Sequence, residues 1–150
     1  MPREKSAGAI VYRMEEGVPY YLLLHYHGGH WEFARGHLEP QEDEMATAKR
    51  EVQEETGIKD LRIVPEFKGY TKFFFKRTYG LSGEAKKKAP WVFKMVILYL
   101  AETKTKNITL SHEHKGFGWF TYEEAMKKLA KDAKKVFTKA NDYLLSKKGL

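Results

Sequence analysis

Apolar residues in the first part of the chain recur in short β-branched and aromatic runs, separated by turn-forming residues. The runs 6–13 and 20–26 predict two strands, and the segment 15–19 between them suits the turn of a hairpin. A brief extended piece is expected at 31–33. Later runs predict one or two strands over 63–75, where Pro65 limits the first, and strands over 91–102 and 116–120.

The hydrophobic period changes to that of a helix after about Asp43. Met45, Ala48 and Val52 recur at helical spacing, and Gly57 stands where a helix C-cap belongs, so a helix is predicted over 43–56. The lysine-rich segment 80–90 is expected to be a loop.

A second helical region is predicted after Thr121. This residue and Glu124, three positions later, form the signature of a capping box. The apolar residues that follow predict one or two C-terminal helices; they are Ala125, Leu129, Val136, Phe137 and Leu144.

Composition narrows the class of protein. A length of 150 residues suits one domain over residues 1–150, and 42% hydrophobic with 31% charged residues is typical of a soluble globular protein. The longest uncharged apolar run, Met95–Ala101, is far shorter than the ~20 residues of a membrane-spanning helix, and no secretory signal is visible. We therefore expect a cytoplasmic monomer with no membrane partner. The absence of cysteine excludes disulfides, thiolate metal sites and a cysteine nucleophile.

The net charge of +7 conceals a division along the chain. Residues 1–58 contain 6 basic and 11 acidic side chains, whereas residues 59–150 contain 21 basic and 9 acidic ones. An acidic segment beside a basic one suits a metal cation held near a polyanionic ligand. The alternative is that most of the C-terminal lysines are simply solvated.

Three carboxylates share one side of the predicted helix 43–56. At ~100° per residue, Glu54 and Glu55 lie about 60° and 40° to either side of Glu51. Neighbouring like charges destabilise a helix; Arg50 can pair with Glu54, four positions later, but one arginine does not offset three acids. A hard divalent cation, Mg²⁺ or Mn²⁺, would neutralise them through carboxylate oxygens. A solvated acidic helix face is the competing interpretation.

Residues 36–58, GHLEPQEDEMATAKREVQEETGI, resemble the Nudix box, G-x5-E-x7-R-E-U-x-E-E-x-G-U, where U is aliphatic. Every fixed position is filled, by Gly36, Glu42, Arg50, Glu51, Val52, Glu54, Glu55, Gly57 and Ile58. The resemblance implies an α/β fold, an α/β/α sandwich around a mixed β-sheet. It also implies hydrolysis of a nucleoside diphosphate linked to another group, with Mg²⁺ or Mn²⁺.

Matching the box by position implies roles for five residues. Glu51 and Glu55 are then metal ligands, and Glu54 is a ligand or the catalytic base. Gly36 offers its carbonyl to the ion, and Arg50 orients the carboxylates. Glu42, near the start of the helix, can accept from Arg50 and hold the preceding loop against the helix.

The flanking segments are similar to asymmetric diadenosine tetraphosphate hydrolases. WEFARGHLEP matches their W-x-x-P-K-G-H-x-E except that Ala34 replaces proline and Arg35 replaces lysine, and LSHEHKGFGWF is also similar. This likeness implies cleavage of diadenosine tetraphosphate to ATP and AMP, with a small nucleotide as the partner. It makes Glu113 a further metal ligand or the base, in competition with Glu54. A zinc site of His112 and His114 with two upstream histidines is disfavoured.

The box itself does not name the substrate. Removal of diphosphate from RNA 5′ ends, cleavage of inositol pyrophosphates and a nucleotide sensor without activity stay open, and a nucleic-acid partner is expected only for the first of these. Candidate substrate-binding residues are basic groups for phosphate and aromatic rings for adenine. They are Arg35, His37, Lys72, Phe74, Tyr79, Lys88 and Phe117.

Overall fold

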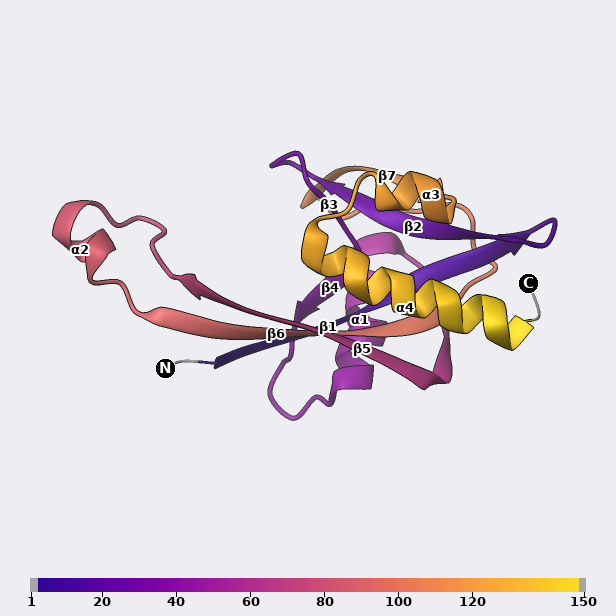
Figure 1. The fold of residues 1–150 in the computed structure, drawn as a ribbon, viewed down its shortest axis with the longest axis horizontal. Helices are drawn as coiled ribbons and strands as arrows, with labels where there is room; N and C mark the ends of the chain where they lie inside the picture. The colour runs from indigo at the N-terminus through magenta and orange to yellow at the C-terminus, as the bar shows by residue number, and fades with distance from the viewer. Residues whose placement is uncertain (1–2, 149–150) are drawn as a thin grey trace.

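A mixed seven-stranded β-sheet forms the centre of the computed structural model, which describes residues 3–148 (Figure 1). Its strands are β1 (Arg3–Glu15), β2 (Val18–Tyr26), β3 (Trp31–Glu32), β4 (Ala34–His37), β5 (Arg62–Lys76), β6 (Trp91–Glu102) and β7 (His114–Phe120). Five of them follow the order β3-β2-β1-β6-β5, while β4 pairs with β1 and β7 with β2. β1 and β6 run parallel, and the neighbouring β1–β2 and β5–β6 pairs are antiparallel. The predicted hairpin of the first two strands is confirmed.

Helices cover both faces of the sheet, so the expected α/β/α sandwich is confirmed. They are α1 (Glu44–Thr56), α2 (Gly83–Lys87), α3 (Tyr122–Met126) and α4 (Lys131–Lys148). Alternate residues of β1 point to opposite layers: Ile10 joins Phe137 of α4 in one apolar core, and Val11 joins Val52 of α1 in another. Figure 1 shows α3 and α4 on one side of the sheet and α1 on the other.

The ends of α1 agree with the prediction and fix its rotation. The Asp43 side chain accepts from the Ala46 backbone N–H at 2.7 Å, and Gly57 ends the helix at φ 78°. Glycine adopts this left-handed conformation without the steric cost that a side chain imposes. Val52 is fully buried in the core. Its burial fixes the rotation of α1 so that Glu51 and Glu55 lie at the edge of that core.

The strands β5 and β6 form a long hairpin whose residues 70–95 we call the arm; β1 pairs with β6 as far as Phe93, and the part beyond that point extends past the rest of the sheet (Figure 1). β5 is one continuous strand whose pairing is irregular between Ile63 and Lys68, around Pro65. The segment 80–90 was expected to be a loop, but it contains α2. A five-residue helix with no buried residue leaves no apolar periodicity in the sequence, which is why the prediction missed it.

The C-terminal region forms two helices, α3 and α4. The capping box of Thr121 and Glu124 begins α3 as predicted. In the core, the Tyr21 hydroxyl donates to the Asn141 Oδ1 at 2.6 Å, which joins β2 to α4. No helix within residues 3–148 is long and apolar enough to cross a membrane.

Candidate active site

Arg50 of α1 binds several acidic side chains of α1 and of the loop before it. Its guanidinium donates to Glu42 at 2.6 and 2.9 Å, to Glu51 at 2.9 Å and to Glu54 at 3.2 Å. It also donates to the backbone carbonyl of His37 at 3.1 Å, so it joins the loop before α1 to the helix. These bonds hold the pKa of Glu42 well below its usual range, at about 2. The predicted Arg50–Glu42 and Arg50–Glu54 pairs are confirmed.

The short strand β4 lies directly against the carboxylates of α1. A Cβ atom at Gly36 would fall 2.1 Å from the Glu51 Cδ, so only glycine leaves room for that side chain. The neighbouring Arg35 backbone N–H donates to the Glu55 Oε1 at 2.9 Å. Glu51 and Glu55 therefore face β4, whereas Glu54 is largely solvent-exposed and pairs with Arg50.

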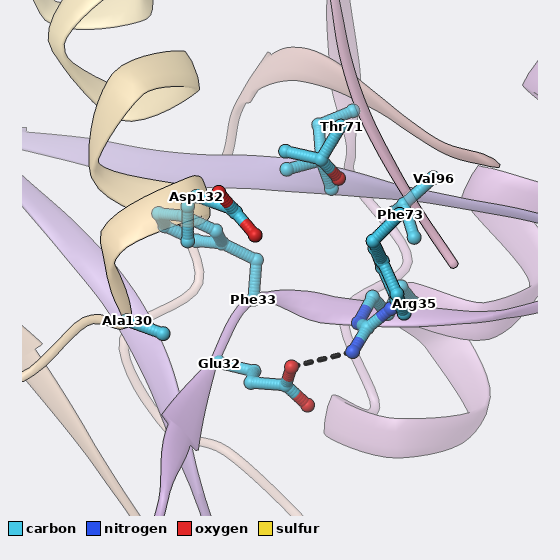
Figure 2. Close-up of a pocket in the computed structure, with 10 residues that line it drawn as sticks. Glu32, Phe33, Arg35, Thr71, Phe73, Val96, Ala130 and Asp132 are labelled. Atoms are coloured by element: carbon cyan, nitrogen blue, oxygen red, sulfur yellow. Dashed lines mark hydrogen bonds and ion pairs between the residues drawn. The ribbon is translucent and has the colours of Figure 1, made fainter. Parts of the chain in front are cut away.

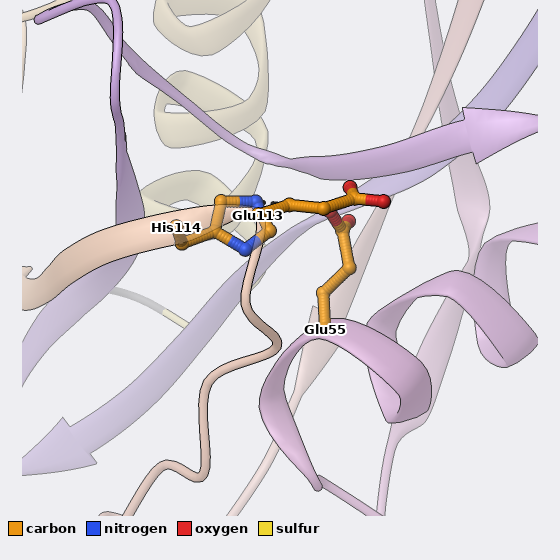
Figure 3. Close-up of side chains that lie close together, drawn as sticks. All are labelled: Glu55, Glu113 and His114. Atoms are coloured by element: carbon orange, nitrogen blue, oxygen red, sulfur yellow. Dashed lines mark ion pairs between the residues drawn. The ribbon is translucent and has the colours of Figure 1, made fainter.

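Glu55 is buried, with 4% of its surface exposed. Burial raises the pKa of its carboxyl group to about 8, and the charge of Glu51 adds to this rise. Its Oε2 lies 3.0 Å from the Nε2 of His114, whose side chain is fully buried. The Nδ1 of the same imidazole lies 3.1 Å from the Ser111 hydroxyl. Figure 3 shows Glu55 reaching from α1 toward His114 and its neighbour Glu113 at the start of β7.

This cluster has the donor set of a divalent-cation site. One ligand atom from each of Glu55, Glu113 and His114 lies within 4.8 Å of the others. The His114 Nε2 is buried without a well-formed hydrogen bond, and a buried carboxylate whose pKa is raised gains most from a cation. Carboxylate oxygens suit Mg²⁺ or Mn²⁺. Glu55 and Glu113 would hold such an ion together with the adjacent Glu51.

Two neighbouring cavities, one of them lined by the carboxylates, lie in this part of the structure. A cavity of about 480 Å³ is lined by Glu51, Glu55 and Glu113 and by two cationic residues, Arg35 and Lys94. A second cavity of about 270 Å³ is mostly apolar and lies between the arm and the start of α4. Glu32, Phe33, Arg35, Thr71, Phe73, Val96, Leu98, Ala130, Asp132 and Ala133 line this second cavity, most of them labelled in Figure 2. The ion pair of Glu32 and Arg35 borders both cavities.

Of the seven residues expected to bind substrate, the structure brings Arg35 and His37 to the cavities. The other five side chains, all within the described residues 3–148, line neither; they are Lys72, Phe74, Tyr79, Lys88 and Phe117. Strand alternation explains the first two, because their neighbour Phe73 faces the cavity and they project from the opposite face. Tyr79 and Lys88 lie beyond, near α2, where the arm has left the sheet.

Three residues of the site were missed as functional groups by the sequence analysis. Lys94 interrupts the apolar run of β6, and that lone charge was the available signal; burial lowers the pKa of its amino group. Tyr26 packs the edge of its ring on His114 at 4.5 Å. His114 was considered only for the disfavoured zinc site, with His112, His25 and His27. In the structure His25 stacks on Trp31 at 4.1 Å, and His114 lies beside Glu55 and Glu113 instead.

Comparison with known proteins gives a consistent result. The NUDIX domain model matches residues 2–140. The bis(5′-nucleosyl)-tetraphosphatase [asymmetrical] of Mus musculus is 32% identical over 155 residues, 95% of this chain and 96% of that protein. The Caenorhabditis elegans protein of the same name is 31% identical over 125 residues, 82% of this chain and 83% of its own.

Solved structures agree with the sequence comparisons. A binary complex of the C. elegans Ap4A hydrolase superimposes with a TM-score of 0.76 at 28% identity, over 95% of this chain and 98% of that one. A MutT protein from Methanosarcina mazei, 24% identical over 95% of both chains, shares the fold with a TM-score of 0.65. With the fold, the complete box and the carboxylate cluster, these matches show that the chain is a hydrolase that belongs to the Nudix family.

Proposed function

We propose that the protein hydrolyses diadenosine tetraphosphate, or a closely related dinucleoside polyphosphate, to ATP and AMP with Mg²⁺ as cofactor and Mn²⁺ as a substitute. The observation that supports this most directly is the arrangement of the cleft. The carboxylates Glu51, Glu55 and Glu113 share one cavity with Arg35 and Lys94, and an apolar cavity adjoins it. The relatives with that activity in their names support the choice of substrate.

The cationic residues suit the polyphosphate part of such a substrate. Arg35 has a planar guanidinium that can bind phosphate through two parallel hydrogen bonds. Lys94 projects from β6 into the same cavity, where partial burial strengthens its attraction to an anion. Arg35 borders both cavities and Lys94 lines the one that holds the carboxylates, so a chain of phosphates bound to them can extend toward the apolar cavity.

The apolar cavity suits a nucleoside. Phe33, Phe73 and Leu98 offer flat or branched apolar surface, and Asp132 and Thr71 offer polar atoms at its rim. Its volume of about 270 Å³ is close to the lower end of the range for small-molecule sites, which suits a nucleobase in contact with these apolar side chains.

The chain's own residues would divide the chemical work. A bound divalent cation supplies a water molecule of lowered pKa and neutralises charge on the phosphoryl group. Glu51 and Glu55 hold that cation, and Arg50 fixes the orientation of Glu51. Glu54 or Glu113 accepts the proton of the attacking water, Arg35 and Lys94 bind the phosphate oxygens, and the P–O bond breaks with the remaining nucleotide as leaving group.

The test is product analysis after incubation with diadenosine tetraphosphate and Mg²⁺ in ¹⁸O-enriched water. ATP and AMP in equal amounts are expected, and the nucleotide that carries ¹⁸O identifies the phosphorus attacked. Glu51→Gln should abolish turnover, whereas Glu123→Gln, an exposed site on α3, should leave it unchanged.

Other products would overturn the proposal. ADP as the main product would mean symmetrical cleavage. Turnover of 5′-triphosphorylated RNA or of an inositol pyrophosphate, without turnover of the dinucleotide, would move the protein to one of the alternative substrate classes. Tight nucleotide binding with no turnover of any of them would instead indicate a sensor.

A further inference from the structure

The arm carries a row of alternating aromatic and basic side chains on the face that points away from the active site. Tyr70, Lys72, Phe74 and Lys76 occupy every second position of β5 and therefore project to one side. The pairing of the strands adds Phe93 opposite Phe74 and Trp91 opposite Lys76. We call these six residues the outer face of the arm.

The outer face is distinct from the substrate cleft. Phe73 and its cross-strand partner Lys94 line the two cavities, so the cleft uses the odd-numbered side of β5 in this region. The outer face lies on the α1 side of the sheet, but α1 begins only at Glu44, which pairs with Lys68 and Lys5 just before the arm starts. Beyond that point no helix covers the strands in the part of the chain that the structure describes (Figure 1).

The aromatic rings of the outer face are accessible and lie next to cations. Phe74 is 57% exposed and Trp91 is 52% exposed. The Phe74 and Phe93 rings lie 5.2 Å apart, and the Lys76 ammonium lies 5.4 Å from the centre of the Trp91 ring. The Arg3 guanidinium of β1 lies 6.0 Å from the Phe93 ring. Such large exposed rings on a sheet surface are uncommon without a partner.

The charge of the arm indicates an anionic partner. Residues 70–95 contain seven basic side chains and one acidic one, Glu84. The salt bridges of residues 3–148 include neither Lys72 nor Lys76. The Lys72 side chain is exposed, and the Lys76 ammonium donates to the Lys87 backbone carbonyl at 3.2 Å, an exposed contact that a phosphate can replace. Same-side residues on a strand are about 7 Å apart, so rings and charges alternate regularly along β5.

We propose that the outer face of the arm binds single-stranded nucleic acid, with bases stacked on Phe74 and Trp91 and phosphates held by Lys72 and Lys76. A single strand presents bases and phosphates in alternation, as the outer face presents rings and ammonium groups. When a base stacks on Trp91, the Lys76 ammonium moves from the ring to the adjacent phosphate. This binding is separate from the proposed hydrolysis, because it uses the opposite face of the same strands.

Two other occupants fit less well. A second copy of the chain would bring two positive faces together, which costs electrostatic free energy. Binding to an anionic membrane requires aromatic rings that protrude further than the neighbouring cationic groups, so that the rings alone enter the apolar layer. Here the Lys76 and Arg3 cations lie over the Trp91 and Phe93 rings, so inserting those rings would carry charges into hydrocarbon.

The experiment measures binding of fluorescein-labelled 12-residue oligo(U) to the full chain by fluorescence anisotropy, in EDTA so that no hydrolysis occurs. Saturable binding is expected, with affinity that falls as salt rises and is at least tenfold weaker for a duplex of equal length. Trp91→Leu should weaken oligo(U) binding about tenfold, whereas Trp91→Tyr, which keeps a ring, should bind like the wild type.

Charge variants test the phosphate contacts. The double change Lys72→Ala and Lys76→Ala should reduce the slope of log affinity against log salt by about 1.4. The double change Lys127→Ala and Lys135→Ala removes the same charge from exposed positions outside the arm and should leave the slope unchanged. Circular dichroism checks that each variant is folded.

Three results would overturn this inference. If the wild type and Trp91→Leu bound oligo(U) with equal affinity, no base would stack on Trp91 and the proposal would be wrong. Equal affinity for duplex and single strand would mean attraction by charge alone. Binding to phosphatidylglycerol vesicles without any binding to oligo(U) would identify the outer face as a membrane-binding surface instead.

Discussion

The His114 Nε2 lies 3.0 Å from the Glu55 Oε2, while the Glu55 Oε1 accepts the Arg35 backbone N–H at 2.9 Å. The carboxylate therefore lies between a backbone donor on β4 and a buried imidazole on β7, whose Nε2 makes no well-formed hydrogen bond. Burial lowers the pKa of His114, which keeps the imidazole neutral at pH 7, and the Ser111 hydroxyl occupies its other nitrogen. A neutral imidazole at this distance limits the movement of the Glu55 carboxylate and adds no charge that would compete with a cation for it.

Replacement of the ligand itself is the first prediction. Glu55→Gln removes the charge but keeps the shape, so kcat should fall by orders of magnitude while the circular dichroism spectrum is retained. The melting temperature at pH 8 should rise, because a neutral amide avoids burial of a charge. Near-wild-type turnover of this variant would refute the assignment of Glu55 as a metal ligand.

His114 is expected to act as a positioning residue through Glu55. His114→Ala leaves the Glu55 Oε2 without its neighbour, so Mn²⁺ affinity, measured by electron paramagnetic resonance, should fall about 10–100-fold. His114→Gln, which retains a side-chain N–H, should recover part of the loss. As a matched control, His112→Ala removes an exposed imidazole two residues away and should leave the Mn²⁺ affinity unchanged. Unaltered Mn²⁺ affinity in His114→Ala would exclude the positioning role.

The stability of the metal-free protein should depend on pH because of Glu55. Its pKa is raised from 4.5 to about 8, so the folded state binds a proton that the unfolded state releases between those values. Stability therefore falls as pH rises toward 8, by at most about 1.4 kcal/mol per pH unit for this group. The lowered pKa of His114 makes stability rise with pH below about pH 6.5, which opposes the effect of Glu55 there. The effect of Glu55 is therefore best measured between pH 6.5 and 8.

Thermal unfolding in EDTA over this window provides the measurement. Tm should decrease with rising pH in the wild type, and saturating Mg²⁺ should abolish the decrease, because the cation binds the ionised carboxylate. The Glu55→Gln protein should show a weaker dependence. A wild-type Tm that is flat or rising from pH 6.5 to 8 would contradict the assigned pKa.

The sequence predicted the parts of the structure that depend on neighbouring positions. The bounds of α1, its Gly57 cap and the Arg50–Glu54 pair follow from spacing along one helix. The contact of Glu55 with His114 joins residues 59 positions apart on α1 and β7, and no local pattern reports it. A shift of one residue in the register of β5 exchanges the side chains that face the cleft. The sequence does not fix this register, and the structure places Phe73 rather than the predicted Phe74 in the cavity.

The final prediction concerns Gly36, whose missing side chain makes space for Glu51. In Gly36→Ala the new Cβ would fall 2.1 Å from the Glu51 Cδ, so the carboxylate must move. The atoms displaced are the end of a flexible side chain, and the fold should survive with a Tm within a few degrees of the wild type. Mg²⁺ affinity and kcat should nevertheless fall at least tenfold, because Glu51 can no longer occupy its position beside Arg50 and Glu55.

Gly116→Ala is the matched control, since its Cβ would meet only the His25 Cβ at 3.8 Å, an ordinary contact. Equal losses of activity in both variants would show that any added methyl group disturbs the site, whereas a loss confined to Gly36→Ala would establish that β4 determines the position of the Glu51 carboxylate.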